Sequence, residues 1–173
     1  VKFQTFSSTS LFSKQAYEND NFVNNDKKNQ NDLTLEKMVK RYSISKENLL
    51  EMKKYSEKIN IDFAATPFSY DEVDYLTNIL NVNFIKIASM DLNNYPFLDY
   101  IARKKKPMIL STGLSELTEI DRAINVIEKT GNKNLVILHC VAIYPPEDKN
   151  INLRNIESFS KIYPYPIGFS DHT

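Results

Sequence analysis

The stretch PMILSTGLSELTEIDRAINVIEKTGNKNLVILHCV, residues 107–141, decides the fold class. It begins and ends with apolar runs, at 107–113 and 135–141, that are continuous rather than alternating. Such runs are typical of strands in a parallel sheet that is covered on both faces. Between them, residues 115–131 have helical periodicity, with Ser115 placed as the N-cap and Gly131 just past the end. The stretch therefore predicts a strand–helix–strand unit.

The same unit recurs along the chain. Further apolar runs that end on small polar residues occupy 1–5, 59–67, 84–89 and 166–173. Helical patterns lie between them, one with Ser45 as its N-cap and one opened by the capping box Ser69-x-x-Glu72. Successive strand ends are spaced roughly like the units of an eightfold barrel, which average about 31 residues. We predict an α/β fold, a partial (β/α)8 TIM barrel comprising about strands two to seven of eight.

Two further expectations concern chain organisation. Residues 1–173 read as one incomplete barrel domain, and the abrupt end on Ser-Asp-His-Thr suggests a fragment of a larger barrel. A doubly wound open sheet also fits the alternation of strands and helices. However, no Gly-x-Gly-x-x-Gly or Gly-x-x-x-x-Gly-Lys turn follows any strand, so dinucleotide and P-loop functions lose their main support.

Composition narrows the class of protein. The 22 basic and 22 acidic residues cancel, so nothing points to a nucleic-acid or membrane-surface binder. One cysteine, Cys140, excludes an internal disulfide, and no apolar run approaches the ~20 residues of a membrane span. These features favour a cytoplasmic domain. The Asn-rich segment 17–32 is expected to be a surface loop, or alternatively a lid over the barrel mouth.

Polar residues at the strand ends are the candidate chemistry, because the C-terminal ends of barrel strands share one mouth. Two lysines with several hydroxyl groups suit a phosphate or carboxylate. The candidates are Lys2, Gln4, Thr5, Thr66, Lys86, Ser89, Asp91, Ser111, Thr112, Tyr144, Ser170, Asp171 and His172.

Each candidate also has a structural explanation. Lys86 is the most informative, because burying a lysine in an apolar strand costs free energy unless it has an anionic partner. Alternatively it is a structural lysine that snorkels to the surface or forms a salt bridge. Residues 111–113 could form only a turn into a helix. His172 could be a hydrogen-bonded structural histidine. His139 and Cys140 are expected to be core or near-core residues.

Six segments together resemble one enzyme family. They are VKFQTF (1–6), ATPF (65–68), KIASMDLNNYPFL (86–98), PMILSTGLSELTEI (107–120), ILHCVAIYPP (137–146) and GFSDHT (168–173). In this order and spacing they resemble the sialic acid (N-acetylneuraminate) synthases, the phosphoenolpyruvate-dependent synthases of nonulosonic acids. The resemblance implies a (β/α)8 barrel followed by an antifreeze-like domain, which this chain lacks, and a homodimer.

The resemblance also implies a reaction and its residues. Phosphoenolpyruvate condenses with an N-acetylated mannosamine-type sugar and phosphate is released, with Mn²⁺ or Mg²⁺ polarising the sugar aldehyde. Gln4 and Tyr144 would lie near the sugar, Asp91 would be catalytic, and His172 would bind the metal. The residues implied to bind phosphoenolpyruvate are Lys2, Thr66, Lys86, Ser89, Ser111 and Ser170.

The chain departs from the family pattern at two positions. Asp91 stands where many members have a longer glutamate, and Ala142 stands where an Asn or Ser often contacts phosphoenolpyruvate. A second metal-binding histidine and an acidic sugar ligand would lie outside the chain. Two other hypotheses remain: another phosphoenolpyruvate aldol-type barrel, such as a 3-deoxy-heptulosonate phosphate synthase relative, or a non-catalytic barrel module.

Overall fold

The computed structural model describes residues 1–19 and 34–173. The predicted loop or lid at 17–32 is wrong at residues 17–19, which end helix α1 (Lys14–Asn19), and from residue 20 onward it lies outside the described residues. The strands are β1 (Lys2–Thr5), β2 (Ala64–Pro67), β3 (Ile85–Ile87), β4 (Met108–Ser111), β5 (Leu135–Cys140) and β6 (Ile167–Ser170). The α-helices are α1 (Lys14–Asn19), α2 (Leu35–Tyr42), α3 (Lys46–Lys58), α4 (Tyr70–Asp74), α5 (Tyr95–Arg103), α6 (Leu117–Lys129) and α7 (Arg154–Ile162). A π-helical turn (Tyr75–Ile79) continues α4, and 3₁₀ turns occupy Ser89–Asp91 and Asp148–Asn150.

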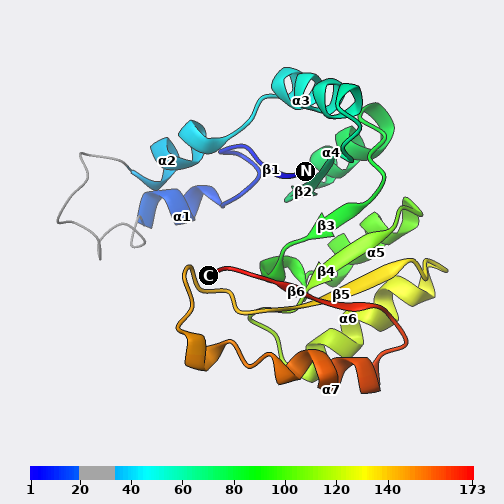
Figure 1. Cartoon of the computed structure of the whole chain (residues 1–173). Coiled ribbons are helices and arrows are strands. Elements are labelled where there is room, and N and C mark those ends of the chain that lie inside the picture. The colour runs from blue at the N-terminus through cyan, green and yellow to red at the C-terminus, as the bar shows by residue number, and fades with distance from the viewer. Residues whose placement is uncertain (20–33) are drawn as a thin grey trace.

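The six strands form one parallel sheet in the order β1-β2-β3-β4-β5-β6. Each strand therefore pairs with its neighbours in sequence, as consecutive strands of a (β/α)8 barrel do, whereas a doubly wound sheet reverses its strand order. Figure 1 shows the sheet curving, with α3 to α7 along its outer side and α1 and α2 beyond β1. The predicted partial barrel is confirmed, and the open-sheet alternative is wrong.

Two of the three predicted helix caps are confirmed. The Ser45 and Ser69 side chains accept hydrogen bonds from the first turns of α3 and α4. The other half of the predicted Ser69-x-x-Glu72 capping box is wrong, because the Glu72 carboxylate accepts from the Phe68 amide and not from that of Ser69.

The third predicted cap is wrong, because α6 is capped by Glu116, not Ser115. The Glu116 and Glu119 side chains form the capping box of this helix, which begins one residue later than a Ser115 cap would require.

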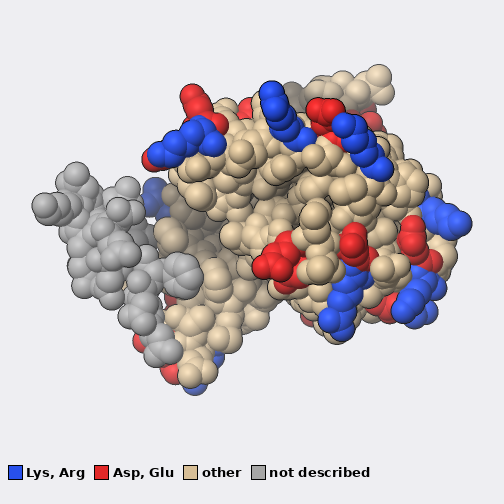
Figure 2. All heavy atoms as spheres, turned by 90° about the horizontal axis from the view of Figure 1, so that it is seen from below, with Lys and Arg blue, Asp and Glu red and all other residues tan. Residues whose placement is uncertain are grey.

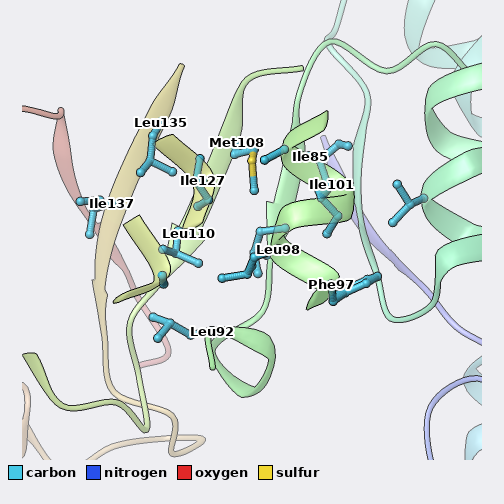
Figure 3. Packing of buried hydrophobic residues seen from close by; sticks show 14 of the residues in the cluster. Ile85, Leu92, Phe97, Leu98, Ile101, Met108, Leu110, Ile127, Leu135 and Ile137 are labelled. Carbon is cyan, nitrogen blue, oxygen red and sulfur yellow. The ribbon is translucent and has the colours of Figure 1, made fainter. Parts of the chain in front are cut away.

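The apolar core lies between the sheet and its outer helices. Met108 and Leu110 of β4 and Leu135 and Ile137 of β5 are nearly inaccessible and pack toward α5 and α6. Figure 3 shows Leu98, Ile101 and Ile127 of these helices facing the same strands. Alternate strand residues point to opposite faces of a sheet, so the residues between them in sequence are left facing the inside of the barrel.

The charged surface agrees with the balanced composition. On the face drawn in Figure 2, lysine and arginine side chains lie among aspartate and glutamate side chains rather than in a patch of one sign. Among the residues that the structure describes, no helix is long and apolar enough to cross a membrane.

Candidate functional site

Strand register brings most of the candidate residues to the inner face. Gln4 pairs with Thr66, and Lys86 lies one position past the Ala65–Ile85 pair, on the same face as Thr66. Ser111 of β4 lies two residues beyond the level of Lys86 and pairs with Leu138; Ser170 lies four residues beyond that level and pairs with Cys140. Because paired residues of parallel strands point the same way, the polar set shares one face near the C-terminal strand ends.

Lys86 is the centre of this set. It is 7% exposed, and its ammonium donates to the Ile87 carbonyl at 2.7 Å and to Ser111 Oγ at 2.5 Å. In the described parts of the chain no carboxylate forms an ion pair with it. Burial, and next the positive charge of Lys2, lower the pKa of Lys86 to about 8. The structural ion pair considered for Lys86 is absent there, and an uncompensated buried ammonium favours binding of an anion.

The remaining residues around Lys86 add charge and hydroxyl groups. Lys2 lies on the edge strand β1, and partial desolvation lowers its pKa. Thr66 and Ser111 are each 2% exposed, and the Ser111 hydroxyl accepts from Lys86. Thr112 instead donates to the Leu138 carbonyl at 3.0 Å, which fits the turn considered for residues 111–113. Thr5 is buried on the opposite face from Gln4 and lies outside the group.

A glycine fixes the position of Ser89. The Gly113 amide donates to Ser89 Oγ at 3.0 Å, and Ser89 Oγ lies 3.5 Å from Cys140 Sγ. A Cβ at Gly113 would stand 2.9 Å from Ser89 Oγ and 3.2 Å from both Cys140 Sγ and Ala142 Cβ. Cys140 was expected in or near the core; it is buried, but it faces the inside of the barrel beside this site.

We expect Gly113→Ala to weaken anion binding while the fold is kept. The added methyl group collides with Ser89 Oγ, so this hydroxyl must move away from its amide donor. Loss of one hydrogen bond to an anion corresponds to roughly a tenfold lower affinity. Calorimetric titration with phosphoenolpyruvate measures this loss, and Ser89→Ala should reproduce it. An unchanged affinity in both variants would remove Ser89 from the site.

His172 is held in one tautomer. Its Nδ1 lies 2.8 Å from the Val141 carbonyl, which can only accept, so in the neutral ring Nδ1 carries the proton and Nε2 has the lone pair. Nε2 lies 3.3 Å from Ser170 Oγ and 3.2 Å from the Tyr144 hydroxyl. The Tyr144 ring stacks on the imidazole with centroids 4.0 Å apart. Sequence reasoning missed the Val141 carbonyl, since a backbone atom leaves no signal in the side-chain pattern.

The second histidine is a core residue, as predicted. His139 is 5% exposed on the outer face of β5, where its Nε2 bonds the Ile151 carbonyl at 2.6 Å. Its ring packs against Phe159 and Phe169. Asp171 is exposed and accepts hydrogen bonds from the Thr173 amide and hydroxyl.

Asp91 follows β3 in a 3₁₀ turn at the same end of the sheet. Burial raises the pKa of Asp91 to about 6; an Asn94 hydrogen bond opposes this rise and the Glu72 carboxylate adds to it. Its Oδ2 is buried and has no hydrogen-bond partner among the described residues. The carboxyl group is therefore able to hold a proton near neutral pH.

The hydrogen bond between His172 and the Val141 carbonyl is a feature that metal-binding histidines usually have. A ligating histidine usually donates its other N–H to a carbonyl or carboxylate, as His172 does to Val141. Within the described ranges, no three His, Cys, Asp or Glu side chains cluster as a metal would require. His172 thus fits as a single ligand of a larger set.

Comparison with known proteins gives the family. The model of the NeuB family matches residues 1–173. The chain belongs to the NeuB family. N,N'-diacetyllegionaminic acid synthase from Campylobacter jejuni is 35% identical over 175 residues, covering 100% of this chain and 51% of that protein. The chain therefore spans about half the length of this NeuB-family relative.

Solved structures agree with this assignment. The N-acetylneuraminic acid synthetase of Leptospira borgpetersenii, in complex with citrate, matches with a TM-score of 0.83 and 32% identity, over 99% of this chain and 54% of that one. A DAHP synthase from Thermotoga maritima matches with a TM-score of 0.63 over 98% of this chain and 49% of that one, at 12% identity. The second likeness shows the fold alone.

Proposed function

We propose that the protein containing this NeuB-family chain condenses phosphoenolpyruvate with an N-acetylated mannosamine-type sugar, giving a nonulosonic acid and phosphate. The observation that carries this proposal is Lys86, a buried ammonium without a carboxylate partner among the described residues and with Lys2 close enough to lower its pKa. Phosphoenolpyruvate bears a phosphate and a carboxylate, and either anion would compensate the two charges.

The anion is held by the strand ends in this proposal. Lys86 and Lys2 supply charge, while the Ser89 hydroxyl, fixed by Gly113, supplies a directional hydrogen bond. The proposed phosphoenolpyruvate ligands are Lys2, Thr66, Lys86, Ser89, Ser111 and Ser170.

The sugar lies toward Gln4 and Tyr144, one at the sheet edge on β1 and the other exposed beside His172. Asp91 holds a proton near the site and donates it to the departing phosphate. Its raised pKa, about 6, supports that role. Because aspartate is one methylene shorter than the glutamate of many relatives, the proton donor reaches less far into the site.

His172 is the proposed ligand of a divalent metal, Mn²⁺ or Mg²⁺. Such an ion supplies Lewis-acid polarisation of the sugar aldehyde. The chain's own contribution is the Val141 carbonyl, which keeps the His172 Nε2 lone pair available, together with Ser170 and Tyr144, which flank that nitrogen. We further propose a cytoplasmic homodimer, with the antifreeze-like domain in the same natural protein.

Product identification tests the function. The natural protein that contains this chain would be offered phosphoenolpyruvate with N-acetylmannosamine, a 2,4-diacetamido sugar or a pseudaminic acid precursor. We expect phosphate release and a nonulosonic acid with one of them, detected by mass spectrometry. Erythrose 4-phosphate is the control substrate, because its turnover would indicate a 3-deoxy-heptulosonate phosphate synthase instead. No turnover with any acceptor would favour the non-catalytic module.

A further inference from the structure

A buried carboxylate lies outside the proposed set of ligands. Glu72, in the first turn of α4, is 7% exposed. In the described residues it has no basic partner, and its hydrogen bonds come from two neutral donors. The Phe68 amide donates to Oε2 at 2.7 Å and the Ser10 hydroxyl donates to Oε1 at 2.5 Å. Burying a carboxylate without a basic partner costs desolvation free energy, so the position of Glu72 between two loops suggests a functional role.

This geometry differs from an ordinary capping box. The Ser69-x-x-Glu72 pattern predicts that the Glu72 side chain accepts the amide of the cap residue itself. Instead it accepts the amide of Phe68, one residue earlier, and its other oxygen is free to bond Ser10. Glu72 therefore joins the β2–α4 turn to the loop that follows β1, which is 62 residues away in sequence.

Ser10 is the matching point in the β1 loop, residues 6–13. The Ser10 hydroxyl also accepts from the Ser7 amide at 2.8 Å, and the Ser7 carbonyl accepts from the Ser10 and Leu11 amides at 3.2 Å. Phe6 packs edge-on against Phe68, with ring centroids 6.0 Å apart. The loop is thus closed by its own turn and attached to the β2–α4 turn at two points.

The attached loop lies next to the proposed sugar side of the site. It follows directly on β1, whose Gln4 faces inward beside Thr66. Glu72 is also near enough to Asp91 for its charge to affect that carboxyl group. We propose that Ser10 and Glu72 form a latch that positions the β1 loop beside Gln4 and thereby sets affinity for the sugar. Glu72 is in this sense a positioning residue, and the role in sugar affinity rests on the proposed function.

Two measurements on the natural protein test the latch. Ser10→Ala and Glu72→Ala should speed hydrogen exchange of the amides at residues 7–11 at least tenfold. They should raise the KM for the accepted sugar three- to tenfold, leaving kcat and the KM for phosphoenolpyruvate within twofold. Glu72→Gln still offers Ser10 an oxygen acceptor, so its exchange rates and its sugar KM should lie between those of the wild type and Glu72→Ala. Ser160→Ala is the matched control, since that exposed hydroxyl bonds only carbonyls of its own helix, α7.

The outcomes distinguish the existence of the latch from its role in sugar affinity. Unchanged exchange at residues 7–11 in Ser10→Ala overturns the latch, even if Glu72→Ala fails to fold. Faster exchange with an unchanged sugar KM overturns the role in sugar affinity. If the wild-type protein turns over no sugar, the proposed function fails and that role falls with it, while exchange in the Glu72 variants still decides whether the latch exists, because Ser10 also holds the Ser7 amide within its own loop.

Discussion

Lys86→Met is expected to lower kcat/KM for phosphoenolpyruvate by about a hundredfold in the natural protein. The ammonium is buried, bonds only Ser111 and the Ile87 carbonyl among the described residues, and has no carboxylate to neutralise it there. Losing two charge-assisted hydrogen bonds from Lys86 to phosphoenolpyruvate, each worth about 1.5 kcal/mol, corresponds to a roughly hundredfold lower kcat/KM. Steady-state kinetics with varied phosphoenolpyruvate measure the change.

Stability separates this role from a structural one. Removing an unpaired buried charge should leave the Tm close to that of the wild type, whereas removing half of a structural ion pair would lower it strongly. Lys106→Met is the control, because Lys106 precedes β4 at the opposite end of the strand and bonds Asn81. A lowered Tm together with unchanged kcat/KM in Lys86→Met would place Lys86 outside the site.

The pH dependence of phosphoenolpyruvate binding gives a second test of the Lys86 charge. The pKa of Lys86 is lowered to about 8, so the free protein loses this charge as pH rises through 8. Phosphoenolpyruvate should therefore bind more weakly at pH 9 than at pH 7, and Lys86→Met should lose most of that difference.

The effect of Lys86 on folding stability has the opposite dependence on pH. The unfolded chain keeps the proton up to its higher pKa, so the Lys86 contribution to folding becomes more favourable between pH 8 and about 10.5.

Sequence predicted the fold because continuous apolar runs need cover on both faces, which a parallel sheet covered by helices supplies, and because helical patterns lie between the runs. The same continuity hides which face each residue takes. His139 and Cys140 are adjacent and both read as core residues, yet one packs against α7 and the other faces the site. Only strand register distinguishes them, and register depends on pairing with distant strands.

The candidate site was also predictable only in part. Lys86 was identifiable because an isolated lysine in an apolar strand has few explanations. The Glu72 contact with Ser10 was not, since the capping-box pattern accounts for Glu72 within its own helix. The wrong cap at Ser115 has a similar cause, because Glu116 and Glu119 together satisfy the helix start of α6 better than one serine.

His172→Ala is expected to abolish stimulation by Mn²⁺ while leaving the fold intact. The residue lies just past β6 and is half-buried, and its ring contacts Tyr144, Ser170 and the Cys140 thiol at the barrel mouth. Its Nδ1 bonds Val141, so Nε2 is the nitrogen that would bind the proposed metal. Removing a ligand should cost more than the ten- to hundredfold in affinity typical of losing an outer-shell partner. Mn²⁺ binding followed by electron paramagnetic resonance, with phosphate release, measures both effects.

The chain offers a matched control in its other histidine. His139→Ala removes a 5% exposed ring that packs against Phe159 and Phe169 and bonds the Ile151 carbonyl, so it should lower the Tm by several degrees. Its folded fraction should keep stimulation by Mn²⁺, because the ring faces away from the site. The two variants should thus behave as opposites, one losing metal dependence and the other stability. If His172→Ala instead lowers the Tm and keeps Mn²⁺ stimulation, its hydrogen bond to Val141 is structural, and His172 does not bind the metal.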